Sequence, residues 1–245
     1  MKFNNYLINN IKGHFLVFVP GFLSRNADHK SVIKKLATYF NNLEYYEYTW
    51  DSSLDWFTAR DRAREEAPKL ANYMETFSDQ NKVSLIGHSL GASIILGCLY
   101  LLSTRKLKVE QVILLGAAVD NDDPVICSAC SAVSDFMFNF YSKDDLILRD
   151  LYTKAELAAP LGFKGLSKTP PKNYIDVDIE PYMPFSVSSL IRSFGSEAKD
   201  PVPVIGPYAD LAADLMDSLF FNQTCLGHSA ANVYLDCLLR MKHMK

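Results

Sequence analysis

Short apolar segments alternate along the chain with longer segments in which apolar residues recur every three or four positions. The first pattern is typical of strands buried on both faces of a sheet, and the second of amphipathic helices. Strands are predicted at residues 14–19, 45–50, 83–86, 111–115, 136–141 and 173–178. Helices are predicted at residues 28–40, 53–77 and 148–157, after the turn at residues 87–91, from Asp123 onward and after His228. We expect Pro68 to kink or split the helix at residues 53–77. Strands that alternate with helices predict an α/β fold with a mostly parallel central sheet and helices on both faces.

One strand-to-helix junction, KVSLIGHSLGASIILGCLYLL at residues 82–102, contains the pattern G-x-S-x-G with Ser89 at its centre. A serine on such a tight turn has a strained backbone that exposes its hydroxyl, and the flanking Gly87 and Gly91 leave room for the adjoining strand and helix. We therefore predict that Ser89 is a nucleophile. Two other interpretations are open. One is a Gly-rich turn without a catalytic role, and the other is a membrane span at residues 83–102, which the polar residues of its first half disfavour.

The composition indicates one soluble domain. The 245 residues, of which 49% are hydrophobic and 22% charged, are sufficient for a single α/β domain with a sizeable core, with two small domains as the alternative. The net charge of −3 favours neither nucleic acid nor an acidic membrane as a partner. The N-terminal segment lacks the long apolar core of a signal peptide, so we expect a cytoplasmic protein, with signal-independent secretion left open.

The five cysteines include one C-x-x-C pair, Cys127 and Cys130. This spacing suggests zinc binding or redox chemistry, but a zinc site needs a second pair of ligands, which the neighbouring sequence lacks. We expect the two cysteines to lie one turn apart on a short helix packed against the sheet. We expect no metal and no cofactor.

A serine nucleophile needs a histidine as base and a carboxylate that orients the histidine. After a serine turn of this kind the acid comes next along the chain and the histidine last. The histidines that follow the turn are His228, in a loop before a helix, and His243, at the extreme C-terminus. We predict that His228 is the base, with a histidine of no catalytic role as the alternative.

The preferred candidate for the acid is Asp145, in the loop after the strand predicted at residues 136–141. Catalytic groups of α/β proteins collect at such carboxyl ends of strands. Asp120 is the second candidate because it also follows a predicted strand, and Asp176 and Asp178 are weaker ones. The alternative for Asp145 is a solvated loop carboxylate beside Asp144.

A tetrahedral intermediate also needs two backbone N–H groups that bind its oxyanion. The first donor is predicted to be Leu90, directly after the nucleophile. The second is predicted to be Phe22, in the loop Pro20-Gly21-Phe22 that ends the first apolar strand. Pro-Gly is also a common turn signal, so an ordinary turn is the alternative.

Four motifs together resemble the α/β-hydrolase superfamily: VFVPGF at residues 17–22, LIGHSLGA at 85–92, YSKDD at 141–145, and Gly227-His228. The chain is more closely similar to a poorly characterised branch, the transmembrane and coiled-coil domain proteins, whose hydrolase-like domain has no assigned substrate. The resemblance implies that Ser89, Asp145 and His228 occupy the triad positions. The chain departs from that branch in lacking membrane spans and in having a long segment before the histidine.

That segment, residues 180–224, allows two interpretations. It is either a lid or cap insertion over the site, whose apolar residues would favour acyl or lipid-like substrates, or a packed extension of the core. In both cases we expect one α/β-hydrolase domain over residues 1–245.

The sequence therefore predicts a serine hydrolase of the esterase or lipase type that acts on a small-molecule or lipid-like ester. Transient membrane contact and the oligomeric state are left open. Other functions compatible with the same residues are acyl transfer, thioester or peptide cleavage, a secreted effector with lipase activity, and a hydrolase-fold binding protein without turnover.

Overall fold

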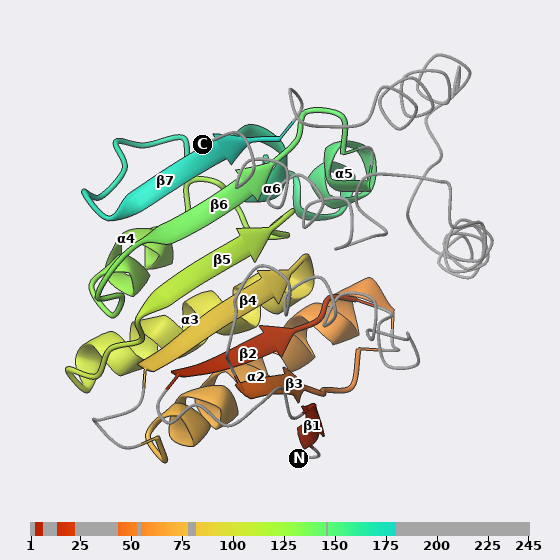
Figure 1. The fold of residues 1–245 in the computed structure, drawn as a ribbon. Helices are drawn as coiled ribbons and strands as arrows, with labels where there is room; N and C mark the ends of the chain where they lie inside the picture. The colour runs from red at the N-terminus through yellow and green to blue at the C-terminus, as the bar shows by residue number, and fades with distance from the viewer. Residues whose placement is uncertain are drawn as a thin grey trace.

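Seven strands form one sheet among the residues that the computed structural model describes, which are 3–6, 14–22, 44–52, 55–77, 82–145 and 147–179. The strands are β1 (Phe3–Tyr6), β2 (His14–Val19), β3 (Glu44–Tyr48), β4 (Lys82–His88), β5 (Gln111–Leu115), β6 (Met137–Tyr141) and β7 (Tyr174–Asp178). Their order across the sheet is β1-β3-β2-β4-β5-β6-β7 (Figure 1). The edge strand β1 is antiparallel to β3, and all other neighbours are parallel. The carboxyl ends of β2 to β7 therefore lie at one edge.

The described helices are α2 (Trp56–Met74), α3 (Leu90–Thr104), α4 (Val125–Cys130), the π-helix η1 (Ile147–Tyr152), α5 (Thr153–Glu156) and α6 (Leu161–Lys164). The first three pack side by side, with α3 between α2 and α4, and cover one face of the sheet (Figure 1). No described helix has the length and apolar character that crossing a membrane requires. The predicted helices at residues 28–40 and after His228, and the segment 180–224, lie outside the described residues.

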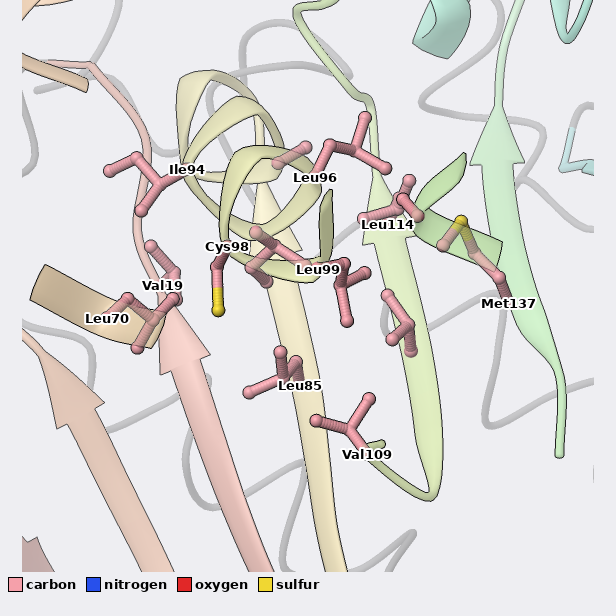
Figure 2. Packing of buried hydrophobic residues seen from close by; sticks show 14 of the residues in the cluster. Val19, Leu70, Leu85, Ile94, Leu96, Cys98, Leu99, Val109, Leu114 and Met137 are labelled. Carbon is pink, nitrogen blue, oxygen red and sulfur yellow. The ribbon is translucent and has the colours of Figure 1, made fainter. Parts of the chain in front are cut away.

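Apolar side chains of the central strands are buried on both faces of the sheet. One set, which includes Val19, Leu85 and Leu114, lies beneath α3 beside Leu99 and Cys98 (Figure 2). The alternate positions, among them Leu16, Phe18, Ile86, Ile113 and Leu115, point to the opposite face and are also buried. Successive strand residues point to opposite faces, so continuous apolar runs are what such strands require. The predicted α/β fold with its parallel sheet is confirmed.

Helix α2 begins later than predicted and is not split. It starts at Trp56 rather than at residue 53 because the Asp55 carboxylate accepts a hydrogen bond from the Thr58 N–H at 3.1 Å and caps the helix. Pro68 lies inside the helix, with its ring exposed. A proline in a helix interior costs about 3 kcal/mol. Alanines on both sides of Pro68, together with Leu70, are buried in the core that α2 shares with α3, and this packing keeps the helix continuous.

The single helix predicted at residues 148–157 is in fact two elements. Residues Ile147–Tyr152 form the π-helix η1, and the α-helical turn α5 follows directly. Leu148 and Tyr152 lie four residues apart in η1, and both side chains are buried. Leu157, which ends α5, has a left-handed backbone with φ of 56°.

Candidate active site

Ser89 lies between β4 and α3 in a backbone conformation that residues with a side chain rarely adopt, with φ of 53° and ψ of −124°. Such a conformation costs about 1–3 kcal/mol and persists only where its surroundings fix it. Three hydrogen bonds hold the turn. The Ser89 N–H donates to the Leu115 carbonyl at 3.0 Å, and the Ser89 carbonyl accepts from the N–H groups of Ala92 at 3.0 Å and Ala118 at 3.1 Å. The strained turn expected from G-x-S-x-G is therefore present.

The second glycine of this motif allows α3 to approach β2 closely. A Cβ atom at Gly91 would lie 2.2 Å from the carbonyl oxygen of Val19 and 2.6 Å from that of Pro20. Real Cβ atoms do not come this close to backbone atoms, so a larger residue would push the start of α3 away from the sheet. Gly91 therefore fixes the first turn of α3 against the end of β2.

The loop after β2 lies directly against the serine. A Cβ atom at Gly21 would be 2.7 Å from the Ser89 Cβ and 3.2 Å from its Oγ. The loop is anchored from the other side because the buried Trp50 donates its indole N–H to the Pro20 carbonyl at 2.8 Å. Phe22 follows Gly21 directly, so the sequence-predicted oxyanion loop and the serine are adjacent in space.

Asp145 follows β6, and its side chain is fully buried. One carboxylate oxygen, Oδ1, accepts a hydrogen bond from the Leu148 N–H at 2.9 Å, and the Asp145 carbonyl accepts from the Arg149 N–H at 2.9 Å. Ser89 and Asp145 follow β4 and β6, parallel strands whose carboxyl ends lie at the same edge of the sheet (the strands are labelled in Figure 1). A carboxylate is buried only where hydrogen bonds compensate for lost hydration, so this position is specific rather than solvated.

The rival acids have other partners. Asp120 lies beyond the end of β5, and its Oδ1 accepts from the Tyr152 hydroxyl at 2.8 Å. Asp176, on β7, accepts from the side chains of Asn139 and Tyr174 at 2.8 and 2.9 Å and from the Leu166 N–H at 2.9 Å. Asp178 ends β7. Both histidines that follow the serine, His228 and His243, lie outside the described residues, so the base stays a prediction from sequence.

The C-x-x-C pair lies as expected on the short helix α4, with Cys127 exposed and Cys130 buried. Burial raises the pKa of the Cys130 thiol to about 12, which opposes the thiolate that metal binding or disulfide exchange needs. Nowhere in the described part of the chain do three His, Cys, Asp or Glu side chains form a group that could hold a metal ion.

Sequence reasoning missed a set of aromatic and charged contacts near the serine. Trp56 was recognised only as part of a helical pattern, yet its indole N–H donates to Glu156 at 2.6 Å and its ring contacts Phe22 and Tyr152. Trp56 and Glu156 are 100 residues apart in the sequence. No periodicity links such positions, and aromatic enrichment alone was the available signal.

The strand order with its antiparallel edge, together with a strained serine in a G-x-S-x-G turn between β4 and α3, defines an α/β-hydrolase fold. The chain belongs to the family described as "Protein of unknown function (DUF726)", which matches residues 42–189.

Two relatives have names that refer to membranes. The chain is 38% identical over 101 residues to an uncharacterized membrane protein of Caenorhabditis elegans, covering 40% of this chain and 16% of the relative. It is 38% identical over 97 residues to a transmembrane and coiled-coil domain-containing protein of Oryza sativa subsp. japonica, covering 38% of this chain and 15% of the relative. The chain thus spans less than a fifth of either relative. The resemblance to this branch is confirmed.

Among solved structures, the chain is similar to an acyl-protein thioesterase 2 of Zea mays. Sequence identity is 13%, the match covers 72% of this chain and 88% of the thioesterase, and the TM-score is 0.43. A likeness this distant does not indicate a substrate.

Proposed function

We propose that the protein is a serine hydrolase that cleaves carboxylic esters through an acyl-enzyme intermediate. The observation that carries the proposal is the backbone of Ser89, with φ of 53° and ψ of −124°, in a turn against which the Gly21 loop lies. Residues held in strained backbone conformations cluster at active sites, where the strain is part of the mechanism. In this turn the strained backbone would present the hydroxyl at the start of α3.

The proposed reaction has two stages. His228 accepts the proton of the Ser89 hydroxyl while Oγ attacks the ester carbonyl, and the negative charge develops on the carbonyl oxygen. The backbone N–H groups of Leu90 and Phe22 bind this oxyanion. Leu90 is the first residue of α3, where an N–H group has no partner four residues earlier in the helix. The positive end of the helix dipole adds to the stabilisation.

Collapse of the intermediate breaks the bond to the leaving alcohol, which receives the proton from His228 and departs. His228 then removes a proton from water, the hydroxide attacks the acyl carbonyl, and Ser89 regains its proton as the acid is released. Asp145 acts in both stages by orienting His228 and stabilising its protonated form. The buried carboxylate, held by the Leu148 N–H, has the fixed position that this role needs.

The experiment is fluorophosphonate labelling of the native chain, followed by intact mass and peptide mapping. A single adduct on Ser89 is expected in the wild type, and none in Ser89→Ala or His228→Ala. The matched control is Ser93→Ala, one turn further along α3. The Ser93 hydroxyl donates to the Leu90 carbonyl at 2.8 Å, and its removal should leave labelling unchanged.

Thermal unfolding of each variant accompanies the labelling. Absence of an adduct on a wild-type protein that unfolds cooperatively would reject the proposed hydrolase. Equal labelling of Ser89 in wild type and His228→Ala would reject His228 as its base. An adduct lost in Ser93→Ala, with Ser89→Ala still labelled, would place the reactive serine elsewhere.

A further inference from the structure

Three aromatic rings from separate elements contact one another in series at the carboxyl edge of the sheet. Phe22 follows β2, Trp56 begins α2 and Tyr152 ends η1. The ring centroids of Phe22 and Trp56 are 5.7 Å apart with an interplanar angle of 85°, and those of Trp56 and Tyr152 are 5.7 Å apart with an angle of 80°. Both are the edge-to-face arrangement that aromatic pairs prefer. We call Phe22, Trp56 and Tyr152 the aromatic wall.

The polar atoms of the wall are engaged in hydrogen bonds within the protein. The Trp56 indole N–H, which is the only donor of that side chain, binds Glu156 Oε1 at 2.6 Å. The other carboxylate oxygen of Glu156 accepts from Arg60 at 2.8 Å, which links α2 to α5. The Tyr152 hydroxyl donates to Asp120 at 2.8 Å. Among the residues that the structure describes, these partners leave ring surface for another molecule, and the rings of Phe22 and Trp56 are only half-buried.

Tyr152 also stays neutral. Its burial, and then the adjacent Asp120 carboxylate that accepts its hydrogen bond, raise the pKa of the phenol above its ordinary value. The wall therefore carries no charge of its own at physiological pH.

Both ends of the wall are tied to residues that contact Ser89. Phe22 directly follows Gly21, whose position lies against the Ser89 side chain. Tyr152 belongs to one buried cluster with Ala118 and Leu148, and the Ala118 N–H donates to the Ser89 carbonyl at 3.1 Å. The wall is thus continuous with the turn that presents the serine hydroxyl.

We propose that the aromatic wall binds an apolar alkyl or aryl group of the ester that Ser89 attacks, and that Trp56 is the residue that determines this specificity. The inference rests on the proposed function and assigns its substrate class: esters with a medium or long apolar chain rather than short or charged ones. Each methylene packed against the rings leaves water, and this gain grows with chain length until the wall is covered. Glu156 and Arg60 act as positioning residues that fix the Trp56 ring.

The experiment compares p-nitrophenyl acetate with p-nitrophenyl octanoate as substrates. The measured quantity is the ratio of kcat/KM for the octanoate to that for the acetate. In Trp56→Ala this ratio should fall at least about tenfold, since several methylenes lose their contact. Trp56→Phe, which keeps a ring but not the bond to Glu156, should retain most of the ratio.

The matched control is Phe57→Ala. Phe57 is the next residue on α2, is 49% exposed and lies under the Arg60 guanidinium rather than in the wall. Its removal should leave the ratio unchanged. An equal loss for both esters in Trp56→Ala, or the same fall in Phe57→Ala, would overturn the inference, because a general structural defect does not select by chain length.

A second measurement does not depend on turnover. Binding of octanoate to the Ser89→Ala protein, followed by calorimetry, should weaken at least about tenfold when Trp56→Ala is added. If fluorophosphonate does not label Ser89 but octanoate binding depends on Trp56, the proposed hydrolase activity is rejected and the proposed apolar binding site is supported. Octanoate binding that is absent, or equal with and without Trp56, overturns the apolar site whatever the labelling shows.

Discussion

A Cβ atom at Gly21 would lie 2.7 Å from the Cβ of Ser89. The two residues follow the neighbouring parallel strands β2 and β4, in which Val19 is paired with Gly87. Three hydrogen bonds fix the serine turn, and Trp50 fixes the loop at Pro20. Both the serine turn and the loop are therefore held in place. Only a residue without a side chain fits at position 21 between them.

Gly21→Ala should therefore displace the loop and, with it, the Phe22 N–H. Removing one oxyanion donor costs about 10²–10³ in rate. We expect the rate of fluorophosphonate labelling to fall by about that factor, and the free energy of unfolding to fall by only about 1–3 kcal/mol, as for other overpacked sites. Labelling kinetics and urea unfolding measure the two quantities.

Gly97→Ala is the control for this substitution. The added Cβ would also meet a side chain at 2.7 Å, but that atom is the Ala67 Cβ, between α3 and α2 and away from the serine turn. It should lower stability without slowing the labelling of Ser89. Similar slowing in both variants would mean that Gly21 affects the site through stability alone.

The strain at Ser89 predicts that the residue costs stability. In Ser89→Gly the positive φ is no longer unfavourable, so the free energy of unfolding should rise by about 1 kcal/mol while labelling is lost. Ser89→Ala removes the same hydroxyl but keeps the Cβ and the strain, so it should be clearly less stable than Ser89→Gly. Urea unfolding of the three proteins measures this, and equal stability of the two variants would show that the turn is not strained.

The sequence predicted the serine turn well because its determinants are local. The two glycines, the apolar strand before Ser89 and the apolar helix after it act within a few residues of each other. The parallel sheet was predictable for a similar reason: strands that are buried on both faces must be apolar at every position. The confirmed part of the prediction is therefore the fold and the place of the serine within it.

The features that local sequence patterns did not predict depend on tertiary packing. Pro68 is a strong local signal for a helix break, yet the buried residues on both sides of it keep α2 continuous. The aromatic wall depends on the contact of Trp56 with Tyr152 and on the hydrogen bond of Trp56 to Glu156, both between distant parts of the chain. The prediction of His228 rests on its order in the chain after Ser89 and on its loop before a predicted helix, and His228 lies outside the described residues.

His14 gives a prediction for the pH dependence of stability. Its Nε2 lies 3.0 Å from the Ser84 Oγ. Burial holds the pKa of His14 below its ordinary 6.5; Glu110 opposes this to a smaller extent, and Lys82 lowers the pKa further. The unfolded chain therefore binds the proton more readily than the folded one. The contribution that the neutral His14 makes to the free energy of unfolding is complete above about pH 6.5. It is lost as the pH falls through that value toward the lowered pKa.

Replacing the imidazole tests this. In His14→Gln the free energy of unfolding should depend less steeply on pH between about pH 7 and pH 5 than in the wild type. Urea unfolding at several pH values gives the two slopes. Parallel slopes would show that His14 has the same pKa in the folded and unfolded chain.

The two candidate acids can be separated by isosteric substitution. Asp145→Asn keeps the side-chain oxygen that accepts from the Leu148 N–H but removes the charge that would orient and stabilise His228. Loss of this charge in a triad lowers turnover by about 10⁴-fold, and ester hydrolysis should fall to that extent with stability nearly retained. Asp120→Asn keeps an acceptor for the Tyr152 hydroxyl and should change hydrolysis much less. Kinetics of an octanoate ester, with thermal unfolding of both variants, decide between them. A large loss in Asp120→Asn beside an active Asp145→Asn would assign the acid to Asp120, and the π-helix after β6 would then serve to hold Tyr152 against it.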